Sequence, residues 1–125
     1  ARYRQLYARQ FVTELQLRQQ EALALFTRRA TELGARIGVA PERVVLSSAN
    51  TLWGSCTAQG VIRLNWRLIH FSPALIDYVI AHELAHLKEL NHSRAFWDTV
   101  AAILPGFEAA RRELRAHHPG RIVAP

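Results

Sequence analysis

Apolar residues recur every three or four positions over the first third of the chain, from residue 2 to about residue 34. This period is that of a helix with one apolar face. The apolar positions form two stripes: Tyr3, Tyr7, Phe11 and Leu15, and then Ala22, Phe26, Ala30 and Leu33. The mostly polar stretch 16–20 lies between the stripes, so one long helix and two shorter helices both fit the pattern. Gly34 and Gly38 are natural points for the helical pattern to stop.

The pattern then changes to short runs of strand-forming residues. Residues 44–46 form a compact β-branched run, and residues 51–56 and 61–65 form two more. The loop between the last two runs ends in Gly60, which can supply the positive φ that a tight hairpin loop needs. We therefore expect a small sheet that contains a hairpin.

Helix signals return at residue 73. Ser72 is a suitable N-cap, and Pro73 suits the first helical position. The helical pattern continues to about Leu90, and Asn91, which tolerates the left-handed conformation, is expected to end it. The residues expected on the buried face are Ile76, Val79, Ile80, Leu84 and Leu87.

Two further helices are expected towards the C-terminus. Ser93 can cap a helix that runs to about Leu104, where a Pro-Gly pair stops it, and another helix follows over residues 107–116. Residues 119–125 are expected to form a flexible tail. The order of elements predicts an α+β fold in a single domain of residues 1–118, with N-terminal helix or helices, a small sheet and C-terminal helices.

Composition narrows the class of protein. Half of the 125 residues are hydrophobic, which is enough material for a core. No run approaches the roughly 18 apolar residues that a membrane helix needs, so no membrane partner is expected. Cys56 is the single cysteine, which excludes an intrachain disulfide and fits a reducing, cytoplasmic location. We interpret Cys56 as a half-buried strand thiol rather than a nucleophile.

The net charge is +6, and every cation except Lys88 is arginine. A basic balance of this size can indicate a phosphate-rich partner such as nucleic acid. The arginines are spread along the chain rather than gathered in one segment, and arginine together with abundant alanine is also what a GC-rich genome produces. Nucleic-acid binding therefore remains a secondary hypothesis.

The most informative motif is His-Glu-Leu-Ala-His at residues 82–86, an HExxH sequence inside the predicted helix. His82 and His86 are four residues apart, so both project from one helix face, about 6 Å apart along the axis. This spacing suits two imidazoles that share a tetrahedral zinc ion. Glu83 lies beside them, where it can act on a metal-bound water. The alternative is an ordinary amphipathic helix that contains HExxH by chance.

A catalytic zinc ion has three protein ligands and one open position, so a third ligand is needed. His92 follows His86 by six residues, the spacing of the last histidine in the longer pattern HExxHxxGxxH. The glycine of that pattern is Glu89 here, so we expect the helix to continue one turn further before Asn91 makes the turn. The alternative third ligands are Glu108 and Glu113, with the more distant candidates being His70, His117 and His118.

This set of residues predicts hydrolysis by metal-activated water. Zinc lowers the pKa of a bound water towards about 7, and Glu83 is placed to take its proton and return it to a leaving amine. A peptide substrate of such an enzyme usually adds a strand to the edge of the sheet. The candidate substrate-binding residues on the hairpin are Trp53, Gly54, Ser55 and Cys56, although Trp53 as a core residue and Gly54 as a bulge fit equally well.

An ordered set of residues over about 50–105 resembles the YgjP-like predicted metal-dependent hydrolases. The set comprises Trp53-Gly54-Ser55-Cys56, Gly60, Ile62, Leu64-Asn65, Ile76-Asp77-Tyr78-Val79-Ile80, His82-Glu83-Leu84-Ala85-His86-Leu87, Asn91-His92-Ser93 and Phe96-Trp97. The resemblance implies a compact zincin fold of the minigluzincin kind. It also implies His82, His86 and His92 as zinc ligands and Glu83 as the catalytic base.

The leading hypothesis is therefore a cytoplasmic zinc metallopeptidase that acts on a peptide or protein substrate. Similar HExxH-plus-His cores occur in SprT-like and Wss-type proteases, which cut proteins crosslinked to DNA. By that analogy, the basic charge suggests a DNA-associated protease, or a nucleic-acid-binding module with structural zinc, as the alternative. A zinc hydrolase that acts on a non-peptide amide is a third hypothesis.

Overall fold

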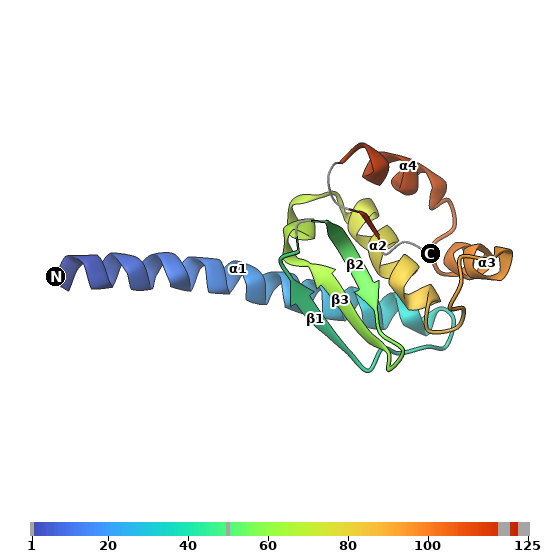
Figure 1. Cartoon of the computed structure of the whole chain (residues 1–125), viewed down its shortest axis with the longest axis horizontal. Helices are drawn as coiled ribbons and strands as arrows, with labels where there is room; N and C mark the ends of the chain where they lie inside the picture. Colours follow the sequence, from blue (N-terminus) through green and yellow to red (C-terminus); the bar gives the residue numbers. More distant parts are fainter. Residues whose placement is uncertain (1, 50, 118–120, 123–125) are drawn as a thin grey trace.

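The computed structural model describes residues 2–49, 51–117 and 121–122, with side chains described for 14–49 and 51–117 (Figure 1). The elements in chain order are helix α1 (Arg2–Ala35), strands β1 (Arg43–Ser47), β2 (Leu52–Cys56) and β3 (Val61–Asn65), a 3₁₀ helix (Trp66–His70), helices α2 (Pro73–Ala85), α3 (Arg94–Ile103) and α4 (Glu108–Ala116), and the short strand β4 (Arg121–Ile122). The predicted α+β class is confirmed.

Helix α1 is a single helix of 34 residues, which settles the choice that the sequence left open. Its second apolar stripe is fully buried, with Ala22, Phe26, Ala30 and Leu33 all at 0% exposure. Leu15, in the first stripe, is 39% exposed, and the side chains of Tyr3, Tyr7 and Phe11 lie outside the described part. The N-terminal part of α1 extends away from the rest of the chain (Figure 1).

The sheet has the strand order β1-β3-β2-β4. Strands β2 and β3 form the predicted antiparallel hairpin, and Gly60 in its loop has φ of 90°. Strand β1 is parallel to β3, and β4 is parallel to β2. Helices α1 and α2 contact each other and pack on the sheet, α1 against β1 and α2 against β2 (Figure 1).

Strand β2 is an inner strand over part of its length. Residues Leu52 and Gly54 pair with Arg121 and Ile122 of β4 on the side opposite β3. The expectation that the hairpin offers a free edge is therefore not met in the described structure. The expected tail, residues 119–125, contains these two paired residues, and the rest of it lies outside the described residues.

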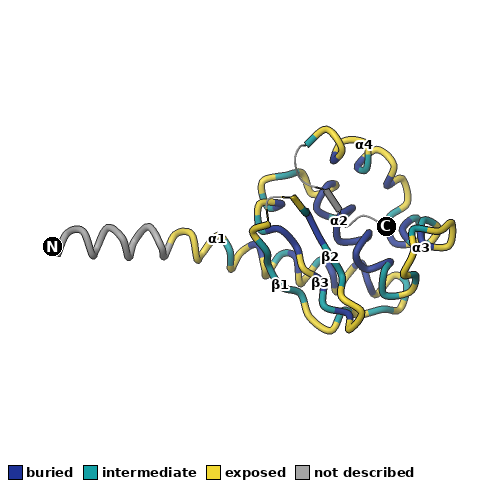
Figure 2. Tube along the Cα trace, viewed as in Figure 1, coloured by how far each residue is buried: buried dark blue, intermediate teal, exposed yellow. Residues whose placement is uncertain are grey.

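Helix α2 forms the centre of the core and is buried along most of its length (Figure 2). It begins as predicted, with the Ser72 side chain accepting a hydrogen bond from the Leu75 amide at 3.4 Å and Pro73 in the first turn. It ends at Ala85, five residues before the predicted end at Leu90. Every non-glycine residue in the described ranges has negative φ, so the expected left-handed turn at Asn91 is also wrong.

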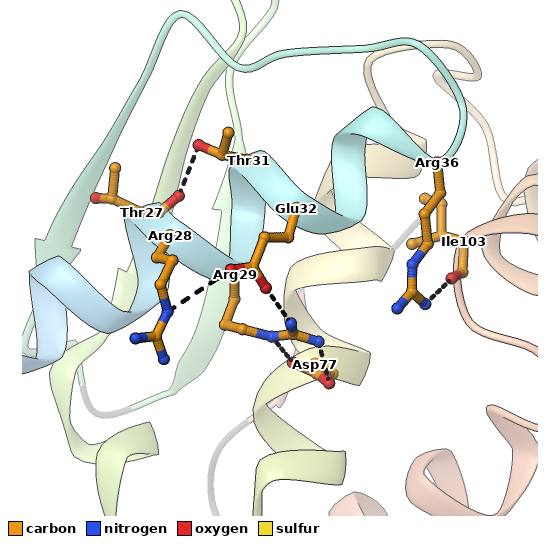
Figure 3. A network of polar contacts seen from close by, with 8 residues as sticks. All are labelled: Thr27, Arg28, Arg29, Thr31, Glu32, Arg36, Asp77 and Ile103. Carbon is orange, nitrogen blue, oxygen red and sulfur yellow. Dashed lines mark hydrogen bonds and ion pairs between the residues drawn. The ribbon is translucent and has the colours of Figure 1, made fainter.

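Helix α1 is tied to α2 by a two-point ion pair (Figure 3). Arg29 donates from Nε to Asp77 Oδ1 at 2.9 Å and from Nη2 to Asp77 Oδ2 at 2.8 Å. Glu32 also accepts from Arg29. Farther along, Arg36 Nη1 donates to the Ile103 carbonyl of α3 at 2.8 Å. The Arg29–Asp77 pair thus fixes α2, which carries HExxH, against the long first helix, and the Arg36 contact joins the end of that helix to α3.

Candidate metal centre

Three histidines converge beside the C-terminal end of α2. His82 and His86 come from the last turn of α2 and its C-cap, and His92 comes from the loop before α3. One ligand atom from each lies within 4.8 Å of the other two. Three donors around a tetrahedral zinc would lie about 3.4 Å apart, given zinc–nitrogen distances of about 2.1 Å. The three residues are thus placed to hold one metal ion.

The hydrogen bonding of these histidines fits a metal site. Nε2 of His86 and both ring nitrogens of His92 are buried and have no hydrogen-bond partner, and the same holds for Nδ1 of His82. The other nitrogen of His86, Nδ1, lies 3.2 Å from the Glu89 carbonyl. Ligating histidines commonly donate their second ring N–H to a carbonyl in this way, which fixes the tautomer and the ring orientation. Nε2 of His86 is therefore the free donor atom.

The backbone after α2 explains how His92 returns without the glycine of the longer motif. The helix tightens into turns with hydrogen bonds from Leu87 to Leu84 (3.0 Å) and from Lys88 to Ala85 (3.1 Å). Such i to i−3 bonds are typical of a helix end that satisfies its last carbonyls within the chain. Because the helix stops early, the loop after it is long enough to bring His92 back to His86. The two ring centroids lie 4.8 Å apart.

Helix α3 forms a wall of the site. It begins directly after His92, with the Ser93 side chain accepting a hydrogen bond from the Phe96 amide at 3.4 Å. The Phe96 ring is fully buried and lies 4.6–5.0 Å from the rings of the three histidines. Trp97 lies slightly farther away, with its ring centroid 5.9 Å from that of His82 and 6.1 Å from that of His92. Aromatic packing therefore limits the movement of the imidazoles and reduces their hydration.

Burial changes the protonation of the histidines. It lowers the pKa of His82 to about 3 and that of His92 to about 4, and it lowers the pKa of His86 as well. The three rings are therefore neutral at pH 7. Neutral imidazole is the form that binds a metal, so these histidines need to release few protons before a metal ion binds.

Glu83 is the most deeply buried charged residue of the site, at 0% exposure. Both of its carboxylate oxygens lack a hydrogen-bond partner among the described residues, and Oε2 lies 3.3 Å from Nδ1 of His82. Burial raises the pKa of Glu83 to about 8, against the opposing effect of His86. With this pKa the carboxyl group is mostly protonated at pH 7, and a pKa raised in this way in a buried site is typical of groups that transfer protons.

The alternative third ligands lie elsewhere. Glu108 and Glu113 are exposed on α4 and are not part of the cluster. His70 packs on Trp66 with ring centroids 5.9 Å apart, and His117 packs on Phe71 at 4.7 Å. His118 lies outside the described residues.

The four predicted substrate-binding residues all lie on β2, next to the site. Gly54 approaches Glu83 so closely that a Cβ added there would lie 3.1 Å from Oε2. Trp53 is 8% exposed and packs edge-on against Phe71 at 5.0 Å, so it contributes to the core. Cys56 is half-buried, and burial raises the pKa of its thiol to about 11. Cys56 is thus a protonated strand thiol at neutral pH.

Sequence reasoning gave no role at the site to a group of aromatic residues from α2, α3 and the start of α4. Tyr78, Phe107 and Trp97 form a stack, with 6.0 Å between the first two rings and 5.7 Å between the last two. The guanidinium of Arg111 lies over the Trp97 ring, 4.2 Å from its centroid. Arginines are so frequent in this chain that no local pattern marks Arg111.

Comparison with known proteins agrees with this geometry. The family model "YgjP-like, metallopeptidase domain" matches residues 4–117, nearly the whole chain. The chain belongs to the YgjP-like metallopeptidase family and is a metal-dependent peptidase. This family implies a bound metal ion, for which the three histidines are placed.

The fold is similar to the crystal structure of the metallopeptidase zymogen of Pyrococcus abyssi abylysin. The TM-score is 0.70 at 20% sequence identity, and the match covers 78% of this chain and 99% of that chain. At this identity the likeness concerns the fold. Comparison with curated proteins gives no significant match. Among the described helices, none is both long enough and apolar enough to cross a membrane.

Proposed function

We propose that the chain is a zinc metallopeptidase in which His82, His86 and His92 hold the metal and Glu83 is the general base. The observation that carries this proposal is that one ligand atom from each of three histidines lies within 4.8 Å of the other two. These histidines carry buried ring nitrogens without a hydrogen-bond partner, beside an unpartnered buried carboxylate. If no ligand were bound here, each buried polar atom left without a partner would reduce the stability of the folded state by about 1–3 kcal/mol.

The donor set favours zinc among the common metals. Three neutral imidazoles are borderline ligands that suit zinc, whereas magnesium and calcium prefer oxygen donors. Zinc held by three histidines would supply a Lewis acid that polarises a carbonyl and lowers the pKa of water to about 7. A nearby cation also lowers the pKa of an adjacent carboxyl, which would return Glu83 to its ionised form.

Glu83 would then move the proton. Its carboxylate would accept a proton from the attacking water and return it to the nitrogen of the leaving amine. Because Glu83 is fully buried and packs closely against the backbone of Gly54, the carboxylate has little freedom to turn away. Such a fixed orientation reduces the reorganisation that proton transfer requires.

The substrate would bind along β2 as an extended strand, beside Trp53, Gly54, Ser55 and Cys56. Main-chain hydrogen bonds would hold the peptide in register with its scissile bond near Glu83. Gly54 supports this placement, because its backbone packs directly against the Glu83 carboxylate, so a strand bound along β2 would lie close to the proposed base. Since β4 pairs with β2 at Leu52 and Gly54, a substrate strand would have to displace β4 there.

The proposal is tested by metal analysis together with Glu83→Gln. Protein purified without chelator should contain one zinc per chain, and Glu83→Gln should keep the zinc but lose peptide hydrolysis by on the order of 100-fold or more. His92→Ala should lose the metal. Full activity of the Glu83→Gln variant would overturn the role of Glu83. Turnover of small amides with no cleavage in a broad peptide library would indicate a non-peptide amide as substrate.

A further inference from the structure

Arg111 is a positively charged residue beside the three histidines that are placed to hold a metal cation. Its guanidinium lies 4.2 Å from the Trp97 ring centroid, and Trp97 in turn lies 5.9 Å from His82 and 6.1 Å from His92. The charge of Arg111 contributes, after burial, to the lowered pKa of both histidines. A positive charge at this place opposes metal binding, so the metal centre itself gains nothing from it.

Among the residues whose side chains the structure describes, no carboxylate forms an ion pair with Arg111. Within residues 14–49 and 51–117, the arginine–carboxylate pairs involve Arg28 and Arg29 and not Arg111. The two acidic residues of its own helix, Glu108 and Glu113, make no ion pair with it. The charges of Arg111 and of Arg115, one turn later, both act to lower the pKa of Tyr78 against the larger effect of burial. A second positive charge therefore lies on the same side of α4.

The stacking leaves Arg111 ready to bind an anion. A guanidinium that lies over an indole face still has N–H groups along its own edge, which can donate two parallel hydrogen bonds to a carboxylate. Trp97 is itself held by its stacking on Phe107 at 5.7 Å. The guanidinium is therefore positioned before any ligand arrives, which reduces the entropy lost on binding.

We propose that Arg111 is a specificity-determining residue that binds a carboxylate of the peptide substrate. The carboxylate belongs either to the free C-terminus or to an acidic side chain a few residues from the scissile bond. Both present the same planar pair of oxygens to the guanidinium. The inference rests on the proposed peptidase site, because only a peptide bound at the metal centre would bring its carboxylate to Arg111.

The test compares matched peptides that differ in one carboxylate. One pair carries Glu or Gln near the cleaved bond, and a second pair ends in a free acid or an amide. The wild-type protein should cleave the carboxylate form of one pair about tenfold better by kcat/KM, the effect of one charge-assisted bidentate contact. In Arg111→Met this ratio should fall to about one. Arg111→Lys should recover only part of it, because lysine loses the fork geometry.

The matched control is Arg112→Met, which removes an exposed arginine next in the same helix and should keep the wild-type ratio. The pair that responds identifies the source of the carboxylate. A wild-type enzyme with no preference in either pair would overturn the inference. If Arg111→Met lowered kcat/KM equally for both members of each pair, the inference would also be overturned. That result would indicate a structural or transition-state role for Arg111.

Binding provides a second readout that does not depend on turnover. Calorimetry with zinc-loaded Glu83→Gln should show about tenfold weaker binding of the favoured peptide when Arg111→Met is added. If the wild-type protein cleaves no peptide but this difference in binding is present, the proposed function fails while the carboxylate site stands. If peptides are cleaved and the difference is absent, the site fails while the peptidase stands.

Discussion

Gly54 on β2 and Glu83 on α2 lie so close that a Cβ at position 54 would come within 3.1 Å of the Glu83 Oε2 atom. Val79 Cγ1 is equally near, and both neighbours are fully buried. Neither side chain can move aside without disturbing the core, because protein interiors are close-packed. The sheet and the HExxH helix are therefore in contact at the proposed base.

Gly54→Ala should damage both stability and catalysis. Overpacking at this contact should lower the free energy of unfolding by about 1–3 kcal/mol. The displaced Glu83 carboxylate should lower kcat/KM by on the order of tenfold to 100-fold. Urea denaturation and peptide cleavage measure the two effects, and zinc content should stay at the wild-type value. A variant with wild-type activity would show that Glu83 is not fixed by this contact.

Metal removal should destabilise the fold, because the three histidines join the end of α2 to the loop before α3. Zinc at about 100 times its dissociation constant should stabilise the native state by about 2.7 kcal/mol, visible as a higher Tm. His92→Ala should abolish this gain. His70→Ala is the control, since His70 is exposed and packs on Trp66. An equal gain in His92→Ala would exclude His92 as a ligand.

The Arg29–Asp77 pair should matter more than the surface pair on the same helix. Both members are mostly buried, with side-chain exposures of 24% and 17%, and they share two hydrogen bonds. Asp77→Ala leaves Arg29 without this partner and should destabilise by about 2–4 kcal/mol. Arg28→Ala, which breaks an exposed pair at 3.8 Å, should cost about 0.5 kcal/mol or less. Chemical denaturation distinguishes the two, and similar losses would contradict the burial argument.

Cys56 should react slowly with alkylating reagents. Burial, with a smaller contribution from the charge of Glu83, raises its pKa from 9.0 to about 11. At pH 8 the thiolate fraction should be about 100-fold below that of an unperturbed thiol. The alkylation rate should keep rising with pH up to about 11. Because the folded pKa is raised, the thiol's contribution to stability is present below pH 9 and is lost as pH rises towards 11. A rate at pH 8 equal to that of the urea-unfolded chain would contradict this prediction.

Removing residues 118–125 should improve substrate binding. The shortened chain lacks β4 and so exposes the side of β2 that β4 pairs with, while Leu114 and the rest of the core remain. If the peptide binds along β2, KM should fall several-fold, because the substrate no longer competes with β4. Steady-state kinetics on peptides of six or more residues measures this. An unchanged or higher KM, with an unchanged Tm, would place the substrate elsewhere.

The sequence by itself determined those parts of the protein that depend on neighbours in the chain. The Ser72 cap, the hairpin with Gly60 and the buried stripe of α1 follow from local preferences and periodicity, and all three are present. The four-residue spacing of His82 and His86 places both on one helix face for the same reason. A helix period is a local property, so no knowledge of the fold is needed to read it.

The tertiary structure decided what depends on partners distant in sequence. The early end of α2 at Ala85 and the return of His92 depend on packing against α3, and the sequence predicted a longer helix instead. The pairing of β2 with β4 joins residues almost seventy positions apart, which no local pattern records. Likewise, only the folded structure brings Arg111 over Trp97, a ring that lies beside His82 and His92. Side chains are buried only once the helices and the sheet have packed together. Burial then shifts pKa values and leaves some polar groups without a partner.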